Sequence, residues 1–156
     1  MRTTLIIPFS NFYDRLTAIV ELYIQPLLNV SARTYVAWVF FASGLTKLRD
    51  WESTIMLFEY EYSVPLLNFE LAAYLATIGE LVLPVLLVLG FASRFAAIGL
   101  SIVNIVAVYS LEDMATAALY GHVIWGLLLL YIVLMGGQKL SVDYLIRRKL
   151  IGQSAA

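Results

Sequence analysis

The chain has 156 residues, of which 62% are hydrophobic and 13% are charged, and its formal net charge is −1. A soluble domain carries about 25% charged residues, so this composition excludes an ordinary soluble domain and indicates a polytopic membrane protein. The near-neutral charge gives no sign of nucleic-acid binding. The length predicts a single membrane domain over residues 1–156.

The sequence contains no cysteine and a single histidine, His122. Without cysteine, the chain cannot form a disulfide, a thiol-exchange site or a cysteine-ligated cluster. One imidazole supplies neither a zinc triad nor both axial ligands of a haem. We therefore expect no metal site and no cofactor bound by the chain alone.

The first predicted element is an amphipathic helix over about residues 9–25. Apolar and polar side chains fall on opposite faces at helical spacing, and Asp14, Arg15 and Glu21 disfavour a membrane crossing. Pro26 is expected to end or kink the helix. We interpret this segment as a helix in the cytoplasmic interface; the alternative is an extension of the first membrane helix with no function of its own.

Four membrane spans are predicted next, over about residues 33–48, 71–90, 95–111 and 114–137. The uncharged part of the first is short, but Arg33 and Lys47 at its ends can extend their charges to opposite interfaces. The other three are apolar runs of about bilayer length. The predicted fold class is all-α: a four-transmembrane-helix bundle with an N-terminal amphipathic interfacial helix.

Two charged segments flank these spans. The acid-rich connection 48–70 is predicted to contain a short surface helix over 53–62, and a connection this long is typical of functional or partner-binding surfaces. The basic tail 138–156 suggests another amphipathic helix that contacts anionic lipid. Basic residues in short loops place the tail, Arg94 and both termini in the cytoplasm, with Lys47 and Arg49 as the exceptions on the outer side.

Glu80 is the single charge in the stretch 71–90 and lies roughly 15 Å below its outer end. A carboxyl group at that depth is costly and usually has a partner or a function. Asn104 and His122 reach similar depths in the next two spans, and a stripe of small residues beside His122 predicts that it points into the bundle. These three side chains form a predicted polar layer near the membrane midplane.

The backbone around Glu80 is also unusual. Pro84 lacks the amide that would bond the Glu80 carbonyl, and Thr77 lies one turn away on the same face. A neutral Glu80 could donate a hydrogen bond to Asn104 or His122, or a protonated His122 could form an ion pair with it. Such a pair either sets helix register or handles a ligand and protons; both interpretations stay open.

Basic residues at the helix ends offer further candidate contacts. Lys47 either extends to the interface or pairs with a carboxylate, namely Glu80 or an acid of the outer loop. Together with Arg49 it could form an outer anion or headgroup contact, and Arg94 is the candidate inner headgroup contact.

Several short motifs resemble those of DoxX-like membrane proteins. Residues 40–48, FFASGLTKL, resemble the signature F-x-x-x-G-x-x-K-L, and the resemblance continues through Val64-Pro65, Gly79-Glu80-Leu81 and the Gly90-x-x-x-Arg94 turn. It covers about residues 32–137. The resemblance implies a four-helix inner-membrane protein of prokaryotes, with Lys47, Glu80 and Arg94 as family-like residues. The family takes its name from a subunit of a thiosulfate:quinone oxidoreductase, and other members resemble accessory membrane proteins.

Three functions follow from these observations. The first is an accessory membrane subunit of a redox-linked system that binds a quinone or similar amphiphile, relays protons through Glu80 and His122, and depends on a protein partner carrying the redox centre. The alternative is a non-catalytic scaffold that docks a partner by the acidic outer loop or the basic tail. A small transporter is less favoured, because one bundle is thin for transport and would require a homo-oligomer.

Overall fold

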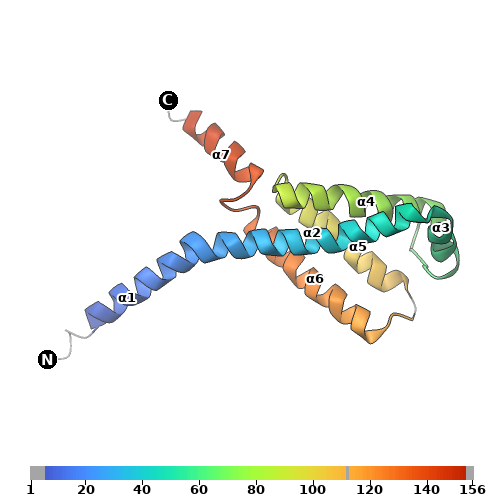
Figure 1. Cartoon of the computed structure of the whole chain (residues 1–156), viewed down its shortest axis with the longest axis horizontal. Coiled ribbons are helices and arrows are strands. Elements are labelled where there is room, and N and C mark those ends of the chain that lie inside the picture. The colour runs from blue at the N-terminus through green and yellow to red at the C-terminus, as the bar shows by residue number, and fades with distance from the viewer. Residues whose placement is uncertain (1–5, 112, 154–156) are drawn as a thin grey trace.

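A computed structural model describes residues 6–111 and 113–153. Apart from one isolated bridge between Tyr62 and Leu111, these residues form helices and the turns between them. The all-helical prediction is therefore confirmed for the described part of the chain. α1 (Ile6–Ile19), the π-helical turn η1 (Val20–Ile24) and α2 (Gln25–Arg49) follow one another without a break and form one long rod (Figure 1).

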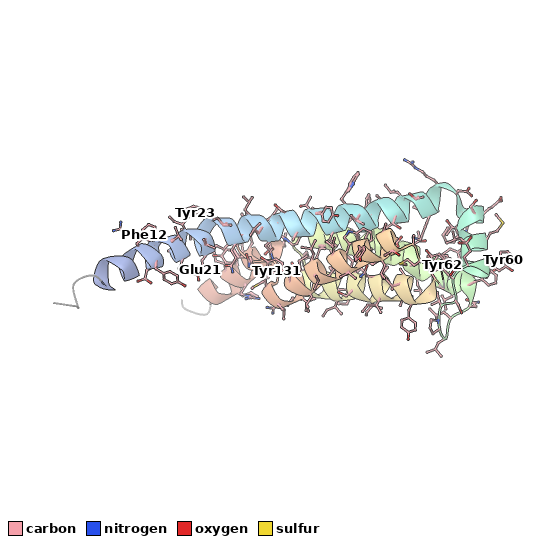
Figure 2. All side chains as sticks on the ribbon, turned by 90° about the horizontal axis from the view of Figure 1, so that it is seen from below. Phe12, Glu21, Tyr23, Tyr60, Tyr62 and Tyr131 are labelled. Atoms are coloured by element: carbon pink, nitrogen blue, oxygen red, sulfur yellow. The ribbon has the colours of Figure 1, made fainter. Side chains whose placement is uncertain are left out.

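Pro26 does not end this rod. In a regular α-helix its ring would clash with the carbonyl of Leu22. The preceding turn is instead widened to π geometry, with the Gln25 amide bonded to the Val20 carbonyl five residues back. The helix expected over 9–25 thus exists as a direct extension of α2. It projects beyond the bundle, where Figure 2 shows Phe12, Glu21 and Tyr23; its place in the membrane interface stays a prediction.

Five more helices follow: α3 (Trp51–Tyr60), α4 (Phe69–Leu89), α5 (Ser93–Ser110), α6 (Thr116–Met135) and α7 (Val142–Gln153). Of these, α4, α5 and α6 are long and apolar enough to cross a membrane, and they match three predicted spans within a few residues. α2 carries Arg33, Lys47 and Arg49, so it does not reach the same apolar length. Its membrane crossing stays a prediction.

Local capping explains where several helices begin and end. The Asp50 carboxylate accepts the Ser53 amide at 3.0 Å, so α3 starts with Asp50 as the single residue between it and α2. Asn68 accepts the Leu71 amide at 2.9 Å and starts α4 in the same way. Gly90 ends α4 with a left-handed φ of +67°, a conformation that glycine adopts without steric cost.

Four helices pack side by side in a closed ring: α2 against α4, α4 against α5, α5 against α6, and α6 against α2. Their shared core is apolar. On α5 the core side chains include Ala96 and Ala97, which are fully buried and small enough to let the neighbouring helices approach closely. The outward faces carry exposed apolar side chains such as Ile105 and Leu127. Apolar side chains therefore lie both in the core and on the outer surface, as a lipid environment requires.

The end of the bundle opposite α3 is closed by polar contacts to the segment 136–143. Asn29 donates to the Gly136 carbonyl at 3.0 Å, and the Arg33 guanidinium donates to the Leu140 carbonyl at 2.5 Å. Arg33 was expected to extend its charge to the interface; it is only 1% exposed. The expectation was wrong because the chain after α6 folds back over this side chain and supplies a carbonyl to it.

Candidate functional site

A cavity of about 530 Å³ lies among α2, α4, α5 and α6, in the half of the bundle nearest α3. Its walls are mainly aliphatic and aromatic, and α3 and the 62–67 loop supply part of the lining. Six polar side chains also reach it, namely Ser43, Lys47, Tyr62, Glu80, Ser110 and His122. An apolar cavity with a few convergent polar groups is the usual form of a small-molecule site.

The ion pair between Lys47 and Glu80 is the strongest polar feature of this cavity. Lys47 Nζ lies 2.6 Å from Glu80 Oε2 and also donates to Ser43 Oγ at 2.9 Å, one turn earlier on α2. The two ionic side chains are 18% and 8% exposed. Lys47 therefore folds inward along its own helix, where a carboxylate offsets the cost of burying its charge.

Gly44 explains why these two helices can bring the pair together. A Cβ atom added at Gly44 would lie 2.9 Å from Leu81 Cγ and 3.1 Å from Glu80 Cβ, which is too close for an undisturbed structure. The missing side chain therefore lets α4 approach α2 at the level of Glu80. The spacing of Gly44 and Lys47 then places the ammonium group one turn further along, within reach of the carboxylate.

Asn104 and His122 form a second polar pair, between α5 and α6. The Asn104 amide nitrogen donates to the His122 backbone carbonyl at 2.9 Å, which turns its oxygen toward His122 Nδ1 at 2.8 Å. Since Asn104 Oδ1 only accepts, Nδ1 carries the hydrogen and Nε2 of a neutral ring keeps its lone pair. The ring packs edge-on against Trp125, with centroids 4.9 Å apart.

The connection between α3 and α4 forms the wall of the cavity at its α3 end. Tyr62 stacks on Phe58 and pairs with Leu111 across a short bridge, and the Ser63 amide donates to the Ser110 carbonyl at 2.9 Å. Burial, and then the charges of Glu80 and Glu61, raise the pKa of Tyr62. Its phenol therefore keeps its proton and can donate into the cavity.

The structure separates the predicted polar layer into two pairs. Glu80 and His122 both line the cavity, but no hydrogen bond joins them among the described residues, because Lys47 takes the carboxylate and Asn104 takes the imidazole. Asn104 is buried behind His122. Thr77 also lies outside the lining, and its hydroxyl donates to the Ala73 carbonyl of its own helix at 2.8 Å.

The other candidate contacts lie outside this cavity. Arg49 is exposed at the last residue of α2 and does not converge with Lys47. Arg94 lies at the opposite end of the bundle, where it is exposed and donates to the Leu134 carbonyl at 3.2 Å.

Sequence reasoning missed several members of the site. Ser43, Tyr62 and Ser110 line the cavity and are not among the residues that the sequence predicted. The four-residue spacing of Ser43 and Lys47 was the available signal for a shared helix face. No comparable signal existed for Tyr62 and Ser110, since a tertiary bridge brings them to the cavity.

Comparison with known proteins agrees with the resemblance seen in the motifs. The model of the DoxX family matches residues 28–113, a segment that contains Lys47 and Glu80 but ends before His122. The chain is also similar to a Haemophilus influenzae protein described as uncharacterized: the two are 31% identical over 123 residues, which cover 74% of this chain and 81% of the relative. No solved structure matches the chain.

Proposed function

This chain belongs to the DoxX family, and on that premise we propose that it is an accessory membrane subunit that binds a quinone or similar amphiphile in the cavity beside the Lys47–Glu80 pair. The observation that carries the proposal is the placement of this pair. It is the one ion pair in the described part of the chain, and it lies in the wall of a mainly apolar cavity.

The cavity suits an amphiphile with a flat, weakly polar head. Its volume of about 530 Å³ falls within the range of roughly 300–1,000 Å³ that small-molecule sites occupy. Lys47 Nζ and the Tyr62 hydroxyl supply hydrogen-bond donors for carbonyl oxygens. The apolar walls contributed by α4 and α5, including Leu75, Ile102 and Val106, suit a ring substituent or the start of an isoprenoid chain.

Proton handling in this proposal rests on Glu80 and His122. A quinone, when bound, couples the transfer of two electrons to the transfer of two protons. The Glu80 carboxylate can accept one proton from a bound quinol and return the same proton to a quinone in the reverse direction. His122 Nε2, with Nδ1 held by Asn104, can accept the other. Electrons are exchanged with a protein partner that carries the redox centre.

The proposed setting is the inner membrane of a prokaryote, with α2 as a fourth span and both termini in the cytoplasm. The first and last helices, α1 and α7, lie on the side of the bundle opposite α3, as an even number of passes requires (Figure 1). Basic residues Arg94, Arg147 and Arg148 also lie in the segments at that end. The excess of positive charge in cytoplasmic loops supports this orientation.

Tryptophan fluorescence tests the proposal directly. The chain has three tryptophans, of which Trp125 lines the cavity and Trp38 is 68% exposed on the outer face of α2. A protein carrying Trp38→Phe and Trp51→Phe retains Trp125 alone. Decylubiquinone added to this protein in nanodiscs should quench the remaining fluorescence saturably, and Glu80→Gln or His122→Ala should raise the half-saturating concentration about tenfold, as loss of one hydrogen-bonding group predicts.

The matched control retains Trp38 and replaces the other two tryptophans by phenylalanine. Quinone dissolved in the bilayer should quench Trp38 in proportion to its concentration, without saturation. If Trp125 responds in the same linear way, the cavity does not bind the quinone. If redox activity in native membranes survives Glu80→Gln but is lost when the exposed acids Glu52 and Glu59 are reversed in charge, the scaffold function replaces this proposal.

A further inference from the structure

A second cavity, of about 210 Å³, lies at the end of the bundle opposite the Lys47–Glu80 pair. The start of α5, the turn after α6 and the first turns of α7 line it, with Arg94, Asp143 and Arg147 as the charged residues in its wall. This cavity belongs to a different level of the molecule from the proposed quinone site. It lies where the two apolar helices α4 and α5 meet in a turn, the level of the membrane–water boundary for helices that cross a bilayer.

Asp143 lines this cavity, and both of its carboxylate oxygens accept hydrogen bonds from the start of α5. Its two carboxylate oxygens accept the amides of Ala92 at 2.7 Å and Ser93 at 2.8 Å, and the Ser93 hydroxyl at 2.7 Å. The Asp143 amide in turn donates to the Gly90 carbonyl at 2.9 Å. The amides at the start of α5 are therefore occupied, and α7 is attached to the α4–α5 turn.

Two guanidinium groups remain available for a ligand. Arg94 is oriented by the Leu134 carbonyl at 3.2 Å, which uses one of its five N–H donors. Arg147 lines the same cavity, and its charge acts on Asp143 without a hydrogen bond between the two described side chains. A pair of guanidinium groups around a cavity matches the geometry of a phosphate.

The rim of the cavity distinguishes a lipid from a free anion. Phe95 and Met135 line it as well, and they are 65% and 45% exposed on the apolar outer surface. A ligand with both a phosphate and an acyl chain would satisfy the two sides of this rim. The tail also carries Lys139, Arg148 and Lys149, so the surrounding potential favours a headgroup with net negative charge.

We propose that this cavity binds the phosphate of an anionic phospholipid, with Arg94 and Arg147 as its cationic contacts and Phe95 and Met135 against the start of an acyl chain. Bound lipid then joins α5, α6 and α7, which no described side-chain ion pair does. The proposal is independent of any ligand in the quinone cavity.

Native mass spectrometry of the purified full chain in detergent tests the site with phosphatidylglycerol and phosphatidylcholine as probes. We expect the wild type to retain phosphatidylglycerol in preference to phosphatidylcholine, and Arg147→Gln to weaken this binding about tenfold, as loss of one guanidinium–phosphate contact predicts. Arg148→Gln is the matched control, because it removes the same charge from the neighbouring position, outside the cavity. It should retain the lipid as the wild type does.

Three results would overturn the proposal. Equal losses in Arg147→Gln and Arg148→Gln would show diffuse attraction to the basic tail, and no loss in either would show that the cavity does not hold the phosphate. Arg94→Lys, which keeps the charge, should fold as the wild type does and should bind the lipid less well, since lysine cannot form the paired contacts of arginine. Inorganic phosphate should not displace the lipid; displacement at millimolar concentration would identify a free-phosphate site instead.

Discussion

Lys47 Nζ and Glu80 Oε2 lie 2.6 Å apart and join α2 to α4 inside the larger cavity. Replacing either partner leaves the other charge largely buried without a counter-ion. We expect Lys47→Met to lower the free energy of unfolding by about 3 kcal/mol, the lower end of the range for a broken buried pair, because Lys47 is partly exposed. Thermal unfolding in detergent would measure this loss.

The double variant Lys47→Met with Glu80→Gln separates an ion pair from two independent effects. The double variant should lose less unfolding free energy than the sum of the two single losses, because it leaves no buried charge without a partner. Arg49→Gln, at the exposed end of the same helix, should stay within about 0.5 kcal/mol of the wild type. Strict additivity of the two single losses would contradict the pairing seen here.

Asn104 should determine which nitrogen of His122 carries the hydrogen. In the wild type, nitrogen-15 chemical shifts of the neutral ring should report the Nδ1–H form. Asn104→Ala removes both hydrogen bonds between Asn104 and His122, so we expect a larger share of the Nε2–H form and a loss of about 1–3 kcal/mol in unfolding free energy.

Ser101→Ala is a suitable control for this prediction. The Ser101 hydroxyl donates to the Ala97 carbonyl of its own helix, so the substitution removes a hydroxyl from α5 without touching α6. The tautomer of His122 should not change in this variant. An unchanged tautomer in Asn104→Ala would show that another group orients the ring.

Asp143 should make the attachment of α7 dependent on pH. Burial acts to raise the pKa of Asp143, but the hydrogen bonds from Ser93 and Ala92 and the charge of Arg147 outweigh it and hold the pKa below the usual 3.8. Because the folded-state pKa is the lower one, this carboxylate contributes stability above about pH 4, and the contribution is lost as the pH falls through the folded-state value.

Amide hydrogen exchange of residues 142–150 between pH 6 and pH 3 would follow this attachment, after correction for the intrinsic pH dependence of exchange. Protection at the start of α7 should fall in the acid range in the wild type and should be low at every pH in Asp143→Ala. Asp113→Asn, which alters an exposed carboxylate outside this junction, should behave as the wild type does. Protection of the wild type that does not vary with pH would contradict the role assigned to Asp143.

Gly90 should tolerate no side chain. Its φ of +67° costs an ordinary residue about 1–2 kcal/mol, and a Cβ there would collide with Arg33 Nη1 and lie 2.5 Å from Ser141 Cβ. Overpacking of this kind adds about 1–3 kcal/mol. We expect Gly90→Ala to unfold at a clearly lower temperature than the wild type.

Gly79→Ala offers the matched comparison inside α4. There the backbone is helical, and the nearest contact of a new Cβ is 3.3 Å, to Val103 Cγ2. A glycine in a helix interior is itself unfavourable by about 0.5–1 kcal/mol relative to alanine, so the two effects should nearly cancel. Equal destabilisation by the two substitutions would show that the Gly90 turn is not specially constrained.

The sequence alone determined the features that depend on local chemistry. Apolar runs placed α4, α5 and α6 within a few residues, and the depth of Glu80 in its helix followed from counting at 1.5 Å per residue. Motifs of a few residues were enough to indicate the family. Two of them contain glycines with a structural role, at the close helix contact of Gly44 and at the turn of Gly90. Pro26 was the local signal that misled in part, since a π turn absorbed the break it predicted.

The tertiary structure decided which polar groups meet. Periodicity assigns a residue to a face of its own helix, but the rotation and spacing of neighbouring helices set which faces come together. Gly44 brought Glu80 to Lys47, and the fold of the segment after α6 buried Arg33 beneath Leu140. Both outcomes depend on contacts between residues far apart in the chain, and such contacts form only when the helices pack together.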